Sequence, residues 1–180
     1  MQYRRARTEG GSYFFTVVTH RRRQFLCEPE NILLLRKIFT EIKQNHPFSI
    51  DAIVILPDHI HSLWTLPAGD SDYSTRWRLI KSEFSRQCKQ RFKGKQTTSR
   101  QKKKEQAVWQ RRFWEHEIQN EMDFQNHANY IHYNPVKHAL AATPADWPYS
   151  SFQSYVDRGL YPSQWGAGKP MEFGSGVGQE

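Results

Sequence analysis

The sequence predicts an α+β fold: a ferredoxin-like, split βαβ antiparallel sheet with helices on one face, and a C-terminal helical extension. The prediction rests on the order of the apolar patterns, which is strand, helix, strand, strand, helix, strand. A further helical pattern then follows, and it carries Tyr130. At 180 residues the chain fits one domain, which we place at residues 1–160, with a glycine-rich tail over residues 161–180.

The first half of the chain supplies a strand, a helix and two further strands. Ser12–Thr19 follows a glycine pair and is rich in aromatic and β-branched residues, which predicts the first strand. A helix is expected to begin near Pro29 and to end at His46-Pro47. Its expected buried stripe consists of Ile32, Leu33, Leu35, Ile38, Phe39 and Ile42. Phe48–Leu56 is the second expected strand, and its apolar end predicts an inner position covered on both faces. A tight turn at Pro57-Asp58 would make the next segment its antiparallel neighbour.

The second half supplies a helix, an insertion, a strand and the helical extension. The helix is expected over Ser74–Phe92, where apolar residues recur at spacings of three and four. Gly94–Ala107 is polar and Lys-rich, and we expect a basic, mobile insertion there. Trp109–Gln119 is the fourth expected strand. Asn120 is a suitable N-cap for the last helix, and Pro135 indicates that its end is near.

The positive charge of the chain is concentrated in one segment. The formal net charge is +8, yet residues 71–113 alone hold fourteen Lys/Arg and three Asp/Glu, a net charge of +11. Such a footprint is typical of nucleic-acid binding, although a solvated surface with a basic loop would look similar. The two cysteines have no metal-like spacing, which suits a reducing cytoplasm, and we expect no membrane segment.

Two histidines form the first candidate site. His59 and His61 stand two apart in an apolar, strand-like run, so their side chains emerge on the same face. Two imidazoles in this geometry can bind one metal ion, although such a pair is often only the polar face of a strand.

The last helix carries a second group of candidates. Tyr130 and Asn134 are one helical turn apart and point the same way. The amide oxygen of Asn134 could be the third ligand of a divalent metal on His59 and His61, which would bring Tyr130 beside the ion. His127, one turn before Tyr130, could be a general base, or it could simply pack. A buried tyrosine beside an asparagine is also common without any chemistry.

Several motifs resemble those of one protein family. His59-Ile60-His61 resembles the HUH motif of single-strand DNA nucleases, and Tyr130–Val136 resembles the tyrosine motif of the REP-associated tyrosine transposases. This family belongs to the HUH single-tyrosine transposases and is related to the insertion-sequence transposases. The likeness extends in the right order over further stretches, namely Gly10–Thr16, Leu56–His61, Arg112–His116 and Asp146–Ser151.

The resemblance implies a metal-dependent endonuclease and strand transferase of the bacterial chromosome. Its substrates would be repetitive extragenic palindromes, which are DNA hairpins with single-stranded neighbours. Tyr130 would form a 5′-phosphotyrosine, while His59, His61 and Asn134 would hold Mg²⁺ or Mn²⁺. The family also implies a monomer in the cytoplasm, associated with the nucleoid. The insertion at Gly94–Ala107 is longer than expected for it.

DNA contacts are expected from side chains that can bind phosphates or stack on bases. The candidates are Arg4, Arg5, Arg76, Trp77, Arg78, Lys81, Arg111 and Arg112.

Three functions remain open from the residues. The chain could be the strand transferase, a hairpin-binding protein without cleavage that organises or represses the chromosome, or a metal-dependent hydrolase that uses water. Tyr133 is a competing nucleophile. The tail could fold back over the active face through Tyr161 and Trp165, or it could be a frayed terminus.

Overall fold

A four-stranded antiparallel sheet is the centre of the computed structural model, which describes residues 8–168, 170–174 and 176–178. Its strands are β1 (Ser12–Val18), β2 (Ser49–Ile55), β3 (His59–Thr65) and β4 (Trp114–Glu117). They lie in the order β2-β3-β1-β4, and every neighbouring pair is antiparallel. This is the strand order of a split βαβ unit, so the predicted fold class is confirmed.

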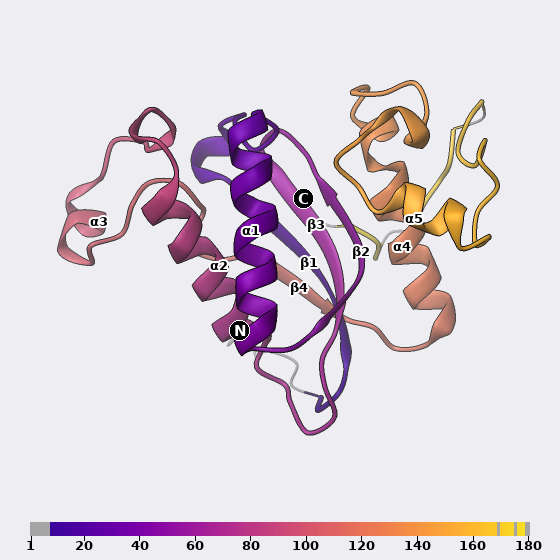
Figure 1. The fold of residues 1–180 in the computed structure, drawn as a ribbon, viewed down its shortest axis with the longest axis horizontal. Coiled ribbons are helices and arrows are strands. Elements are labelled where there is room, and N and C mark those ends of the chain that lie inside the picture. Colours follow the sequence, from indigo (N-terminus) through magenta and orange to yellow (C-terminus); the bar gives the residue numbers. More distant parts are fainter. Residues whose placement is uncertain (1–7, 169, 175, 179–180) are drawn as a thin grey trace.

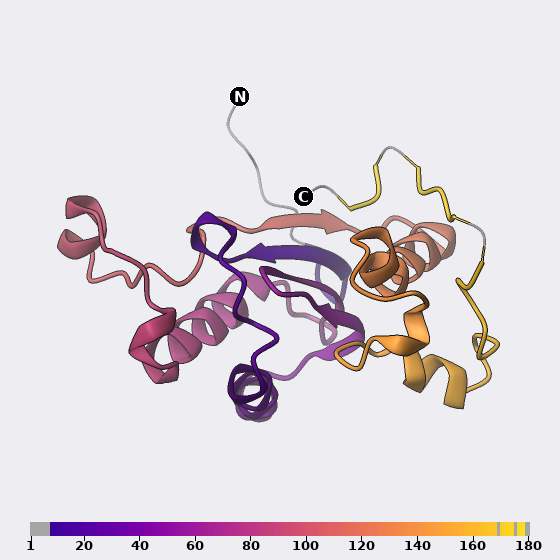
Figure 2. The same ribbon diagram turned by 90° about the horizontal axis from the view of Figure 1, so that it is seen from above.

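Helices cover both faces of the sheet (Figure 1). Figure 2 shows α1 (Pro29–Asn45) and α2 (Tyr73–Gln87) together on one side. The helical extension α4 (Glu121–Lys137) packs on the other face, where Ile131 joins Phe14 and Val54 in one buried cluster. The remaining helices are α3 (Thr98–Lys102), α5 (Phe152–Asp157) and three short 3₁₀ helices at His20–Arg22, Gln90–Phe92 and Pro144–Asp146. None of the helices in the described ranges is long and apolar enough to cross a membrane.

Strand alternation separates the two cores. In β1, Tyr13 and Phe15 point to the side of α1 and α2, while Phe14 points to α4. The larger core is built on aromatic rings, and its centre is a stack of Trp64 on Trp77 with ring centroids 4.4 Å apart. Each face of the sheet therefore has its own apolar contact layer.

Helix ends follow the expected local chemistry. The Asn120 side chain accepts a hydrogen bond of 2.9 Å from the Asp123 backbone N–H, which confirms it as the N-cap of α4. Asp72 does the same for α2 by accepting from Thr75 N–H at 3.0 Å. The cap of α4 fixes where its helical turns begin, and hence which side chains face the sheet.

Three expectations about the elements were wrong. Leu33 is 66 % exposed because it stands one position off the stripe that α1 buries. Strand β2 is covered on both faces as expected, with Ile55 in one core and Val54 in the other, but it is an edge strand and not an inner one. Its open side is covered by the chain near Ser151, whose N–H donates a hydrogen bond of 2.9 Å to Ile53 O. Helix α2 ends at Gln87, well before Phe92, because Cys88 has extended backbone angles.

The Lys-rich insertion has a structure of its own. It contains α3, and its two ends are joined by a bridge in which Gly94 N–H donates 3.0 Å to Ala107 O. Arg100 on α3 is buried and donates a hydrogen bond of 3.2 Å to Trp109 O, so a charged side chain attaches the insertion to the domain. The strand that follows is also shorter than expected, since only Trp114–Glu117 pairs with β1.

Candidate active site between β3 and α4

His59 and His61 lie side by side on the face of β3 that α4 covers. Both are buried, and their ring centroids are 4.7 Å apart. Each ring is held through Nδ1: His59 by Asp58 Oδ1 at 2.6 Å, and His61 by Thr16 Oγ1 at 3.0 Å. A carboxylate on Nδ1 places the proton there and leaves Nε2 of His59 with its lone pair, as in many metal-binding histidines.

The contact with His59 also affects the pKa of Asp58. Burial alone would raise the pKa of Asp58, but hydrogen bonds and charges from His59 and Arg22 outweigh it and lower the pKa. The carboxylate is therefore ionised at neutral pH and stays available to orient the His59 ring.

Helix α4 and the residue that caps its C-terminus lie against this pair. Tyr130 packs edge-on against His61 at a centroid distance of 5.3 Å, and His138 packs against His59, also at 5.3 Å. Asn134 is one helical turn from Tyr130 and from His138, so the three residues share one side, and Asn134 is fully buried. The fold thus brings Tyr130 to the histidine pair, and the ligand role of Asn134 stays a prediction.

Several polar atoms in this site are buried without a hydrogen bond. Nε2 of His59 and both side-chain polar atoms of Asn134 have no hydrogen-bond partner among the residues that the structure describes. An unsatisfied buried polar group is destabilising by about 1–3 kcal/mol, so these atoms are available to bind a ligand. Imidazole nitrogen and amide oxygen are donors that suit a divalent transition metal.

A second group of possible metal ligands lies at the start of α4. The ligand atoms of His116, Asp123 and His127 are within 4.8 Å of one another. Asp123 joins the two rings, with Oδ2 at 2.8 Å from His116 Nε2 and Oδ1 at 3.0 Å from His127 Nδ1. Because His127 Nδ1 also lies 2.9 Å from the backbone oxygen of Asp123, that nitrogen carries its proton and is a donor. Hydrogen bonds to Asp123 thus hold both rings, while Nε2 of His127 is buried without a hydrogen-bond partner among the described residues.

The Tyr130 hydroxyl makes contacts that the sequence did not indicate. Lys137 Nζ donates a hydrogen bond of 2.8 Å to the phenol oxygen, and the ammonium also lies 4.7 Å from the ring centroid. No hydrogen bond joins His127 to Tyr130 in the described part of the chain, and burial lowers the pKa of His127. Lys137 and His138 were missed, although they stand seven and eight residues after Tyr130 and therefore on the same helix side.

The C-terminal tail covers Tyr130. The ring of Phe173 is perpendicular to that of Tyr130 at 5.3 Å, and the Tyr130 hydroxyl donates 3.2 Å to Gly178 O. Gly178 has φ +68°, and a Cβ atom at this position would overlap the Tyr130 ring, so the close approach requires glycine. Tyr161 anchors the start of the tail, because its hydroxyl donates 2.6 Å to Asn129 Oδ1. The tail does fold back, but through residues beyond Tyr161 and Trp165.

Comparisons with known proteins agree with this arrangement. The family described as "Transposase IS200 like" matches residues 8–134. The chain belongs to the IS200-like transposase family. Transposases of this kind cut and join DNA, and the resemblance deduced from the motifs is thereby confirmed.

Relatives of this transposase match it over nearly their whole length. The REP-associated tyrosine transposase of Escherichia coli K12 is 42% identical over 175 residues, which cover 97% of this chain and 96% of that protein. A putative REP-associated tyrosine transposase of Haemophilus influenzae is 44% identical over 176 residues, or 95% and 96% of the two chains. The solved structure of a REP-associated tyrosine transposase bound to a REP hairpin matches with a TM-score of 0.78 at 40% identity, covering 100% of this chain and 98% of that one.

The candidate DNA contacts of this transposase fall into separate groups. Arg4 and Arg5 lie outside the described residues. The structure contradicts the prediction that Arg76 and Trp77 contact DNA. Trp77 is fully buried in the aromatic core, so its ring cannot stack on a base, and Arg76 is only 4 % exposed. The Arg76 guanidinium is used inside the domain, donating 2.7 Å to Pro47 O and 2.5 Å to Asp70 Oδ2.

The other candidates are closer to solvent. Arg78, Lys81 and Arg111 line one cavity, while Arg112 is exposed outside that cavity lining.

Proposed function

We propose that this chain is a metal-dependent endonuclease and strand transferase for single-stranded DNA, with Tyr130 as its nucleophile. The observation that carries the proposal is the packing of Tyr130 against His61, with Asn134 one turn further along the same helix side. A phenol, two imidazoles and an amide oxygen in one buried site are suitable groups for cleaving a phosphodiester through a covalent tyrosine ester.

The proposed metal site consists of His59, His61 and Asn134, with Mg²⁺ or Mn²⁺ as the ion. A bound divalent ion polarises a phosphodiester and orients it for in-line attack. The unsatisfied atoms of both His59 and Asn134 support this site. In the group around His116 the Asp123 carboxylate already binds both imidazoles, although Nε2 of His127 has no hydrogen-bond partner among the described residues either. Asp58 and Thr16 would keep both imidazole rings oriented toward the ion.

The reaction that we propose exchanges one phosphate ester for another. The Tyr130 oxygen gives up its proton and attacks the phosphorus, the bond to the 3′ oxygen breaks, and that oxygen takes up a proton. The products are a 5′-phosphotyrosine and a free 3′-hydroxyl. Lys137, 2.8 Å from the phenol oxygen, would stabilise the negative charge on it. Because the ester conserves the phosphoryl bond, a second 3′-hydroxyl can attack it, and strand joining needs no nucleoside triphosphate.

The proposed substrate is a DNA hairpin of the repetitive extragenic palindromes, with unpaired DNA beside the stem. Support comes from the name of the relative in Escherichia coli and from the hairpin in the solved structure of a related transposase. We further propose that the chain acts as a monomer on the bacterial chromosome in the cytoplasm.

The test is a denaturing gel of end-labelled hairpin DNA incubated with Mn²⁺ or Mg²⁺. Wild-type protein should give a protein–DNA adduct that survives denaturation, and Tyr130→Phe should abolish it. Tyr133→Phe is the matched control, because it removes the neighbouring phenol from the same helix and should leave the adduct. A His59→Ala variant should bind the hairpin and fail to cleave it.

Other outcomes would assign another function. Cleavage without an adduct, unchanged in Tyr130→Phe, would indicate a hydrolase that activates water. Tight hairpin binding without cleavage in either metal would indicate a binding protein. An adduct lost in Tyr133→Phe alone would move the nucleophile to that residue.

A further inference from the structure

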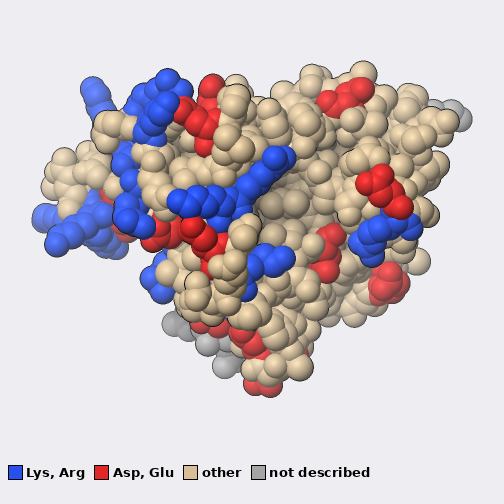
Figure 3. All heavy atoms as spheres, in the orientation of Figure 1, with Lys and Arg blue, Asp and Glu red and all other residues tan. Residues whose placement is uncertain are grey.

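A cavity of about 630 Å³ lies between α2 and the segment that leads from the Lys-rich insertion into β4. Figures 1 and 2 place α2 and α3 at the end of the molecule opposite α4, so this cavity is remote from Tyr130. Figure 3 shows Lys and Arg gathered over the same end. The cavity is therefore a feature separate from the candidate active site.

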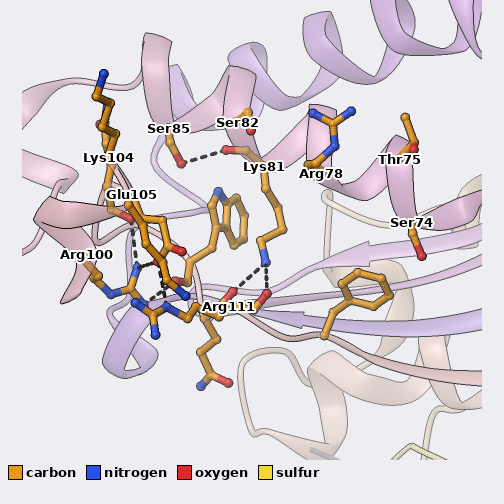
Figure 4. A pocket seen from close by; sticks show the side chains of 15 residues that line it. Ser74, Thr75, Arg78, Lys81, Ser82, Ser85, Arg100, Lys104, Glu105 and Arg111 are labelled. Carbon is orange, nitrogen blue, oxygen red and sulfur yellow. Dashed lines mark hydrogen bonds and ion pairs between the residues drawn. The ribbon is translucent and has the colours of Figure 1, made fainter. Parts of the chain in front are cut away.

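One face of α2 forms the first wall of the cavity. The side chains that line it from this helix recur at helical spacing, and they are Ser74, Thr75, Arg78, Lys81, Ser82 and Ser85. Figure 4 shows them opposite Arg100, Glu105 and Arg111. Hydroxyl and cationic groups on a single wall are the donors that bind phosphate oxygens.

Other cationic side chains hold the opposite wall in place. Lys81 Nζ donates 2.6 Å to Gln110 O and 3.1 Å to Arg111 O, which ties this segment to α2. Arg100 donates 3.1 Å to Gln106 O and 3.2 Å to Trp109 O. Hydrogen bonds within the protein thus join α2 to the segment on the opposite side of the cavity.

Three further cations of the lining are not used in this way. Arg78, Lys103 and Lys104 are exposed, and their side chains have no hydrogen bond or ion pair with the described residues. The one carboxylate in the lining, Glu105, is already paired with Arg111 at 2.7 Å, and this pairing lowers its pKa. The three free cations therefore face a cavity whose negative charge is neutralised.

Aromatic rings also contribute to the lining of the cavity. Trp109 and Phe113 both contribute to the lining. The Trp109 side chain is buried, and its Nε1 has no hydrogen-bond partner among the described residues, nor has Oε1 of Gln106. A positive groove with aromatic rings is the arrangement by which proteins hold unpaired nucleic-acid strands.

We infer that this cavity is a second DNA site, which binds an unpaired stretch of the strand that the active site cleaves. Its volume lies within the ~300–1,000 Å³ of pockets that enclose one small ligand, so it has room for one or two nucleotides and not for a duplex. Arg78, Lys103 and Lys104 would contact the phosphates, while the partly exposed ring of Phe113 would contact the base. The inference rests on the proposed function for the identity of the strand.

The test compares two triple variants that lose the same charge. The first is Arg78→Gln, Lys103→Gln and Lys104→Gln, in which no described hydrogen bond is lost. The second, the control, is Arg36→Gln, Lys37→Gln and Lys43→Gln, which removes exposed cations of α1. Binding of labelled oligothymidine and of a blunt DNA duplex is followed by fluorescence anisotropy over a range of salt concentrations. Thermal unfolding checks that both variants remain folded.

The cavity variant should bind oligothymidine at least about ten-fold more weakly at low salt than the control does. Each phosphate contact to a single strand contributes about 0.7 to the slope of log K against log salt, so three lost contacts should reduce it by about 2. Duplex binding should fall equally in the two variants.

Three results would overturn the inference. The first is equal affinity of the two variants for oligothymidine. The second is a loss of duplex affinity in the cavity variant that is as large as its loss of oligothymidine affinity. The third is that the wild-type protein does not bind oligothymidine. Because oligothymidine binding requires no hairpin and no cleavage, the proposed function can fail in the adduct assay while this site stands, and the reverse also holds.

Discussion

Lys137 donates a hydrogen bond of 2.8 Å to the phenol oxygen of Tyr130, across two turns of α4. The pair is possible because α4 continues through Pro135 as far as Lys137. The helix thus places a positive charge on the atom that we propose as the nucleophile.

Replacing Lys137 should slow cleavage. A hydrogen bond to a charged group is worth about 1.5–3 kcal/mol, so Lys137→Met should reduce the single-turnover cleavage rate by about 10- to 100-fold. Lys137→Arg, which keeps the charge, should retain most of the rate. Lys37→Met, at an exposed position on α1, is the control. Equal rates for Lys137→Met and wild type would remove Lys137 from the reaction.

Removing the end of the tail should speed cleavage. Gly178 O accepts a hydrogen bond from the Tyr130 hydroxyl, and the Phe173 ring packs against the Tyr130 ring. The tail must therefore move away before DNA can reach the phenol. A chain that ends at Gly168 keeps the anchor at Tyr161. It should cleave about five-fold faster in single turnover, the equivalent of about one neutral hydrogen bond.

A point substitution offers an independent check of the tail contact. In Gly178→Ala the new Cβ would overlap the Tyr130 ring and displace the tail, so this full-length variant should also cleave faster. If both proteins cleave at the wild-type rate, the tail does not restrain Tyr130.

Asp58 should control the affinity for metal. Asp58→Asn keeps an oxygen beside His59 Nδ1 and loses the negative charge, and changes of this kind weaken metal binding by about 10- to 100-fold. Titration of the protein with Mn²⁺ by calorimetry measures the effect, with the exposed Asp157→Asn as control. Should His116→Ala abolish binding while Asp58→Asn leaves it intact, the ion belongs to the group at the start of α4.

His132 should make the fold sensitive to mild acid. Burial lowers the pKa of His132 to about 3, while an unfolded histidine titrates near about 6.5. Between these values the unfolded chain binds a proton that the folded chain excludes, so the free energy of unfolding falls as the pH drops below about 6.5 and is retained above it.

The size of this effect can be measured by urea unfolding. Between pH 7 and pH 5 the His132 contribution should decrease by about 2 kcal/mol. His132→Gln should lower stability at pH 7, because contacts to Ser151 and Tyr161 change, and should show a flatter pH dependence than wild type. The same pH dependence in both proteins would mean that other groups, such as His127, dominate.

Local patterns were sufficient for the fold class and for deciding which candidate site residues point the same way. Alternation in β3 places His59 and His61 on one face, and a spacing of four on α4 places Tyr130 and Asn134 on one side. These relations depend only on the periodicity of a strand and of a helix. They therefore do not change with the packing around them.

Positions that depend on distant parts of the chain were not predictable in this way. Trp77 stands on a helix that could present an aromatic ring to DNA, yet its ring stacks on Trp64 and is part of the buried core. Strand β2 has the composition of an inner strand, and a segment about a hundred residues later, at Ser151, covers its edge. Burial is decided by what packs against a residue, and that partner is remote in sequence.

The sequence by itself determined the family, the two motifs and the residue types of the candidate site. Only the tertiary structure decided that Lys137 contacts Tyr130, that the tail covers it, and that the basic segment lines a cavity with exposed cations. The physical reason is that local periodicity sets the direction of a side chain relative to its own helix or strand. Contacts between elements depend on how the sheet brings together segments far apart in the chain.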